Sequence, residues 1–144
     1  MIEFHYETDF ELGLKTQISN WLEQIIQDEG CVLNDVNYIF CDDDYLHKLN
    51  VDFLDHDTLT DVISFDYCVG KNLQGDIFIS IERVQDNAND FKVPFNEELL
   101  RVMCHGLFHF CGYKDKSEED AVLMRSKENE ALSLYKSKFN TNTL

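Results

Sequence analysis

The sequence has few of the residues that form linkers between domains, and no long apolar run that would anchor it in a membrane. Its 144 residues include a single proline and six glycines, with no internal repeat or low-complexity tract, so no linker is evident. No apolar run approaches the roughly 20 residues needed to span a bilayer. The N-terminus is neither basic enough nor apolar for long enough to be a signal peptide. We therefore expect one soluble domain over residues 1–144, without a membrane partner and large enough to bury a core.

Cysteine is present but provides no disulfide framework. The five cysteines are an odd number and include no C-x-x-C pair. A chain of this length folds without such cross-links, so the composition favours reduced thiols and a cytoplasmic protein. Cys104 and Cys111 flank the motif described below, but they project from the apolar side of its helix. We interpret them as core packing rather than as ligands.

Basic residues are scarce. Twelve lysines and arginines stand against 28 acidic residues, which gives a formal net charge of −16. Non-specific nucleic-acid binding depends on neutralising phosphates with Lys and Arg, and the sequence has no strong basic cluster. Taken alone, the charge counts mildly against a nucleic-acid substrate.

One dense motif stands out between residues 104 and 115. His105 and His109 are four residues apart, so on a helix both imidazoles leave the same face. Gly112 follows, where a left-handed residue can end a helix and fold the chain back, and Asp115 comes three residues later. This spacing predicts a three-ligand metal site with an open position for water. The alternative, two core histidines satisfied by neighbours, explains neither the glycine nor the carboxylate.

The residue after the first histidine limits the chemistry. A zinc protease with this histidine spacing carries glutamate there as its general base, and this chain has Gly106. A small metalloprotease is therefore disfavoured, and no general base is evident. Two histidines and a carboxylate also suit Fe(II) or Mn(II). The iron oxygenases with such ligands usually place them on a β-barrel rather than along one helix.

Hydrophobic periodicity predicts an α+β domain, a mixed sheet of about four strands packed by helices. Asn96 is expected to cap a zincin-like metal helix, and Ser117 to open the last helix, whose packing residues would be Leu123, Leu132 and Leu134. The expected strands are 2–7, 32–41, 62–67 and 76–80, and the expected helices are 12–30, a short one from 42, 81–89, 96–111 and 117–139.

Three sequence blocks resemble the YbeY family of bacterial endoribonucleases, the rRNA maturation factors. The blocks follow the family order and separations between residues 49 and 115. They are Leu49-Asn50-x-x-Phe53 running into Asp57-x-x-Thr60-Asp61-Val62-Ile63-Ser64-Phe65, then Gly75-Asp76-Ile77-Phe78-Ile79-Ser80, and then His105-Gly106-Leu107-Phe108-His109-Phe110-Cys111-Gly112-Tyr113.

The resemblance implies a metal-dependent hydrolase that cleaves single-stranded RNA. Its expected roles are 3′-end maturation of the small-subunit rRNA and ribosome quality control, with rRNA and the small ribosomal subunit as partners. One zinc ion per chain is expected. His105 and His109 match the first two family ligands, whereas Asp115 stands where the family has a third histidine. Fe(II) or Mn(II) therefore stays open as the metal.

A second departure from the family concerns positive charge. Leu54 occupies the position of a family arginine that would contact phosphate or stabilise developing negative charge. His56, where the family often has lysine, is either a substitute or an ordinary loop residue. Arg101 is either a cation of the site or the partner of a buried acid. These features keep open an alternative function, a ribosome assembly factor with a structural metal.

Other residues of the blocks have two interpretations each. Thr60 and Asp61 would either orient substrate or form ordinary turn chemistry before a strand. Asp76 is expected to lie in a turn or to contact a metal ligand, rather than to act in catalysis. Tyr113 would either reach the metal-bound water or close the turn, and we favour the turn.

Overall fold

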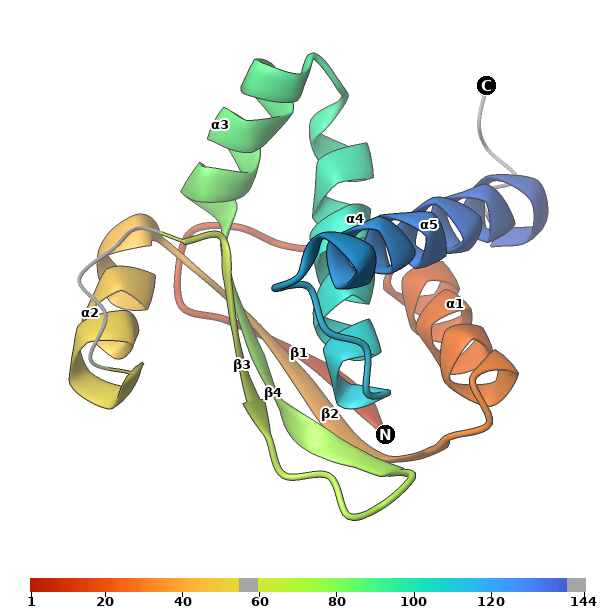
Figure 1. Ribbon diagram of the computed structural model, residues 1–144. Helices are drawn as coiled ribbons and strands as arrows, with labels where there is room; N and C mark the ends of the chain where they lie inside the picture. The colour runs from red at the N-terminus through yellow and green to blue at the C-terminus, as the bar shows by residue number, and fades with distance from the viewer. Residues whose placement is uncertain (55–59, 140–144) are drawn as a thin grey trace.

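The computed structural model describes residues 1–54 and 60–139, in which helices cover a four-stranded sheet (Figure 1). The strands are β1 (Ile2–Tyr6), β2 (Val32–Cys41), β3 (Val62–Asp66) and β4 (Asn72–Ser80). Their order is β1-β2-β4-β3, and β3 alone is antiparallel to its neighbour. The mixed α+β sheet expected from the sequence is thus confirmed, and β3 lies at its edge.

One face of the sheet carries the main core. Val36, Tyr38 and Phe40 alternate along β2 and are fully buried, as their spacing predicts. Three helices cover this face (Figure 1), namely α1 (Lys15–Asp28), α4 (Phe95–Phe110) and α5 (Glu118–Leu134), and a π-helical turn, η1 (Tyr135–Phe139), extends α5. Trp21 of α1 is fully buried, and its indole N–H donates to the Ala131 carbonyl at 2.7 Å.

The opposite face of the sheet is covered by α2 (Asp43–Leu54) over a smaller cluster that contains Cys41, Leu46 and Ile63. The N-terminal end of α2 is tied to the start of α3 (Ile81–Phe91). The Ser80 hydroxyl donates to Asp43 Oδ1 at 2.6 Å, and Arg83 pairs with Asp43 Oδ2 at 2.7 Å. Because these contacts fix one end of α2, its other end reaches a defined place beside β3.

The helices correct two expectations and confirm a third. Asn96 is not the cap of α4, because Pro94 takes that position; its fixed φ of −61° suits a helix start. Ser117 does cap α5, accepting from the Asp120 N–H. Leu123 does not pack, being 50% exposed, because the buried stripe of α5 runs through Met124 and Leu132 instead. Among the described residues, no helix is long and apolar enough to cross a membrane.

Candidate metal centre

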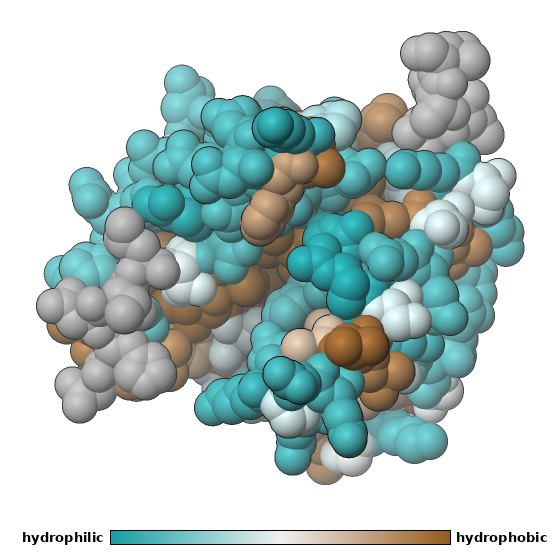
Figure 2. Space-filling view, turned by 45° about the horizontal axis from the view of Figure 1, so that its top comes forward, coloured by the Kyte–Doolittle hydropathy of each residue, from teal (hydrophilic) through white to brown (hydrophobic). Residues whose placement is uncertain are grey.

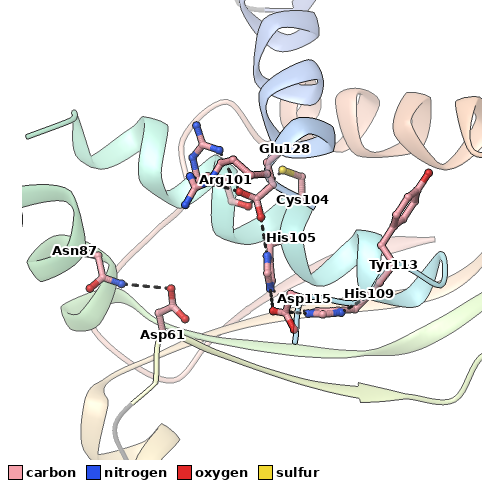
Figure 3. A network of polar contacts seen from close by, with 10 residues as sticks. Asp61, Asn87, Arg101, Cys104, His105, His109, Tyr113, Asp115 and Glu128 are labelled. Atoms are coloured by element: carbon pink, nitrogen blue, oxygen red, sulfur yellow. Dashed lines mark hydrogen bonds and ion pairs between the residues drawn. The ribbon is translucent and has the colours of Figure 1, made fainter. Parts of the chain in front are cut away.

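The turn after α4 brings the third side chain back to the two histidines. Gly112 has a φ of +105°, which favours glycine, and its N–H donates to the His109 carbonyl. The Tyr113 N–H donates to the Phe108 carbonyl, which completes a Schellman motif. The chain therefore reverses within two residues, and Asp115 returns to the histidine face of α4, as the spacing predicts (Figure 3).

Three potential ligand atoms form a small triangle. His105 Nε2 and His109 Nε2 are 3.0 Å apart, and Asp115 Oδ2 lies 3.1 Å from the first and 3.4 Å from the second. A tetrahedral ion about 2.0–2.1 Å from each ligand separates the ligands by about 3.4 Å. The triangle is thus close to the size that a zinc-like ion requires.

The other nitrogen of each ring decides which atoms face the centre. His109 Nδ1 lies 2.9 Å from the Tyr113 carbonyl, which can only accept, so this nitrogen carries the proton. His105 Nδ1 lies 2.6 Å from Glu128 Oε2. Burial alone would raise the pKa of Glu128, but hydrogen bonds from His105 and Arg101 outweigh it and lower the pKa. Glu128 is therefore an ionised acceptor, and His105 Nδ1 donates to it.

Three acceptors consequently converge on one point. With Nδ1 as the protonated nitrogen of each ring, the Nε2 atoms face each other and the Asp115 carboxylate. A proton on one Nε2 can bridge these atoms in the metal-free protein, and a bound cation can replace that proton. His105, His109 and Asp115 can thus hold a metal ion, and two histidines with a carboxylate suit a borderline divalent ion.

Glu128 is the site residue that sequence reasoning missed. Its side chain on α5 is nearly buried and also accepts from Arg101 at 3.0 Å. Arg101 is therefore the partner of a buried acid, which was one of its two interpretations. Burial tends to lower the pKa of His105, but the hydrogen bond and charge of Glu128, with Asp115 and Asp61, outweigh it and raise the pKa. In the sequence, the signal for this partner is an acidic residue at a position where the helical spacing of α5 calls for an apolar one.

A second carboxyl group faces the centre from the opposite wall. Asp61 precedes β3, and Figure 3 shows it across a gap from His105, with the Asn87 amide donating to it at 3.3 Å. Burial raises the pKa of Asp61, while hydrogen bonds from Asn87 and backbone N–H groups and the charge of His105 oppose the rise. Asp61 is thus a partly desolvated acid beside the candidate ligands, where a proton acceptor or donor would act.

A cleft of about 550 Å³ opens beside the triangle, lined by His105 and His109 on one side and by Asn50 and Leu54 of α2 on the other. Figure 2 shows a hollow in the surface with hydrophobic side chains on its floor and hydrophilic ones around it. Among the described lining residues, Lys116 is the one cation. Leu54 therefore replaces the family arginine with an apolar wall; His56 and Asp57 lie outside the described residues.

The free edge of β3 forms part of this cleft. Ser80 N–H donates to the Asp61 carbonyl, and Tyr67 N–H donates to the Gln74 carbonyl. Because hydrogen-bonded pairs alternate in an antiparallel ladder, the backbone groups of Val62, Ser64 and Asp66 point away from β4. These three residues all line the cleft.

The remaining residues of the sequence blocks take structural positions. Thr60 Oγ1 donates to the Val62 carbonyl at 3.4 Å, which is ordinary turn chemistry. Asp76 accepts from Asn37 at 3.1 Å, and Tyr113 closes the turn while its hydroxyl donates to Glu29 at 2.6 Å. All five cysteines are free thiols, and burial raises the pKa of Cys104 far above its ordinary value, as expected of a core residue.

Gly106 leaves no room for the glutamate of a zinc protease. A Cβ at this position would lie 3.0 Å from Ile77 Cγ2 and 3.2 Å from Ile77 Cδ1 on β4. Even a methyl group would therefore require the Ile77 side chain or the helix to shift, and a glutamate side chain finds no open space here. The peptidase alternative is not favoured.

Comparisons with known proteins identify the family. A family model described as endoribonuclease YbeY matches residues 2–136. A Flavobacterium psychrophilum protein named endoribonuclease YbeY is 59% identical over 140 residues, 97% of this chain and 100% of the relative. A Flavobacterium johnsoniae protein of the same name is 58% identical over 135 residues, 94% of this chain and 97% of the relative.

A solved structure gives the same fold. The solution structure of TM1509 from Thermotoga maritima superposes with a TM-score of 0.71 at 28% identity, covering 99% of this chain and 94% of that one. The resemblance drawn from the three sequence blocks is thus confirmed over nearly the whole chain. The chain belongs to the YbeY family.

Proposed function

We propose that this chain is a metal-dependent endoribonuclease of rRNA processing. Its relatives carry the name endoribonuclease over nearly their full length. The alternative, an assembly factor with a structural metal, is not favoured, because the triangle opens onto a cleft rather than being closed by a further described ligand.

The observation that carries the proposal is the convergence of three acceptors. His105 Nε2, His109 Nε2 and Asp115 Oδ2 lie 3.0–3.4 Å from one another. We assign these three atoms as ligands of one divalent ion per chain. Zinc is the proposed ion, and the oxygen ligand keeps Fe(II) and Mn(II) as alternatives that metal analysis distinguishes.

The bound ion would supply Lewis-acid chemistry, polarising a phosphoryl oxygen and acidifying water. The protein's own residues orient the ligands and hold protons. Glu128 holds the proton on His105 Nδ1, and the Tyr113 carbonyl does the same for His109, so both rings keep the tautomer that ligation requires. Asp61, with its raised pKa, is the described group placed to hold a proton on the opposite wall. The attacking group, water or the RNA 2′-hydroxyl, is a question for product analysis.

The cellular setting forms part of the same proposal. We propose rRNA of the small ribosomal subunit as the substrate and the cytoplasm as the compartment; the five free thiols support a reducing environment. We also propose a single domain over residues 1–144, supported by a core cluster that joins β2, α1, α4 and α5.

The test combines metal analysis with cleavage of single-stranded RNA, for wild type and His109→Ala. We expect near-stoichiometric metal and cleavage in the wild type and loss of both in the variant. Metal retained without cleavage of any RNA would contradict the nuclease assignment. Absence of metal after purification without chelators would contradict the ligand assignment.

A further inference from the structure

A row of four aromatic rings ends on the surface beside the cleft. Tyr45 and Phe78 have ring centroids 6.2 Å apart, Phe78 and Phe65 are 5.7 Å apart, and Phe65 and Phe53 are 6.2 Å apart. Phe53, the last ring, is 68% exposed, whereas Phe65 and Phe78 are partly buried. A large apolar side chain fixed by its neighbours but open to solvent is a candidate contact for a partner.

Phe53 lies beside residues of α2 that line the cleft holding the candidate ligands. Leu54, the next residue, and Asn50, one turn earlier, both line that cleft together with His105 and His109. The other end of α2 is fixed by the bonds from Ser80 and Arg83 to Asp43. The ring is therefore presented by an anchored helix, which lowers the entropic cost of binding.

The charges around the candidate ligands favour an apolar contact with the substrate. A second pocket adjoins the cleft and is lined by residues of α3, α4 and α5. Among the described residues that line the cleft and this pocket, five are acidic, namely Asp61, Asp66, Glu98, Asp115 and Glu128. The cations there are Lys116, Arg101 and Arg125, and both arginines lie within 4 Å of Glu128. With Leu54 in place of an arginine, little phosphate neutralisation is available to hold an RNA strand.

We propose that the exposed ring of Phe53 stacks against an unpaired base of the RNA substrate, next to the scissile segment. This inference rests on the proposed nuclease function and names the contact that selects single strands. Base–aromatic stacking needs an accessible base face, which a paired base inside a duplex does not offer. The outward backbone groups of Ser64 on β3, on the cleft wall, are available to the same strand as hydrogen-bonding partners.

The experiment measures cleavage of a short single-stranded RNA of mixed sequence by metal-loaded wild type, Phe53→Ala and Phe53→Trp. Stacking losses on alanine substitution correspond to roughly a tenfold rise in KM for Phe53→Ala, with kcat little changed. Phe53→Trp should keep the wild-type KM. The salt dependence of KM should be the same in all three proteins, because a phenyl ring neutralises no phosphate.

A series of RNAs, each with one abasic nucleotide, identifies the stacked base. One position should reproduce the Phe53→Ala loss in the wild type and add nothing in the variant. Val122→Ala, an equally exposed apolar truncation on α5, is the matched control and should leave KM unchanged. Equal KM values for wild type and Phe53→Ala would overturn the stacking proposal alone. A wild type that cleaves no RNA would overturn the nuclease function and the stacking proposal together.

Discussion

Glu128 holds His105 from the side opposite to the candidate metal. Its Oε2 lies 2.6 Å from His105 Nδ1, while Nε2 of the same ring lies 3.0 Å from His109 Nε2. One carboxylate on α5 thereby fixes both the orientation and the tautomer of a ring on α4. Carboxylates in this role make their histidine a stronger metal ligand.

Glu128→Gln should weaken metal binding without removing a ligand. The amide keeps the size of the side chain but loses its charge, so we expect metal affinity to fall roughly 10- to 100-fold. Competition titration with a chelator measures the change. Glu130→Gln on the same helix, where the side chain is exposed and pairs with Lys127, is the control and should bind metal as the wild type does. Equal affinities in all three proteins would contradict the positioning role.

The same pair gives the metal-free protein a pH window of extra stability. Despite burial, the pKa of His105 is raised above its ordinary 6.5 by Glu128, and the pKa of Glu128 is lowered below its ordinary 4.5. The stabilisation is therefore fully present between these two ordinary values. It is lost as pH rises through the folded-state pKa of His105 or falls through that of Glu128.

Unfolding by denaturant, in chelator, measures this window. The free energy of unfolding of wild type minus that of Glu128→Gln should be greatest at about pH 5–6 and decline on either side. A difference that does not change with pH would show that the two groups are not coupled as an ion pair.

Asp115 variants test the third ligand. Asp115→Ala leaves two histidines, and we expect metal affinity to fall by more than the roughly 10- to 100-fold that follows from disturbing a ligand's partner. Asp115→His restores three ligands of the kind the family pattern has, so it should recover zinc binding and reduce the preference for Fe(II) or Mn(II). Metal content after dialysis against mixed ions reports both effects. Full metal content in Asp115→Ala would remove Asp115 from the ligand set.

Gly106→Ala should destabilise the fold through one methyl group. The added Cβ would lie 3.0 Å from Ile77 Cγ2, so the Ile77 side chain or the helix must shift slightly, at a cost of about 1–3 kcal/mol. Thermal unfolding of the metal-free protein measures the loss. Gly13→Ala has no atom within 4 Å of the new methyl and serves as control. A Gly106→Ala variant as stable as the wild type would mean that the contact between α4 and β4 accommodates a methyl group.

Much of the candidate site was predictable because its ligands are local in sequence. His105, His109, Gly112 and Asp115 fall within eleven residues, and helical spacing with a left-handed turn brings them together. Glu128 could not be paired with His105 in the same way, since their contact depends on how α5 crosses α4. Asp61 likewise comes from the opposite wall of the cleft, and periodicity carries no information about its distance from a helix elsewhere.

The fold shows the same division between local and long-range information. Strand β2 was predicted with its observed bounds because Val36, Tyr38 and Phe40 alternate regularly. The start of α4 differs from the expectation because Pro94 and Asn96 are both good residues for a helix start, and local propensity does not choose between them. Leu123 is apolar and lies next to the buried stripe, so its hydrophobicity alone predicts packing, but tertiary packing buries the face through Met124 and Leu132 instead.

The turn that follows α4 also reaches the rest of the helical layer. Glu29, directly after α1, accepts from the Tyr113 hydroxyl at 2.6 Å and from Lys127 at 2.7 Å, while Lys127 is the chain neighbour of Glu128. Three helices thus meet at the residues that orient the two imidazoles. By thermodynamic linkage, an ion bound there stabilises the packed arrangement of all three helices. The melting temperature should therefore rise with the free metal concentration.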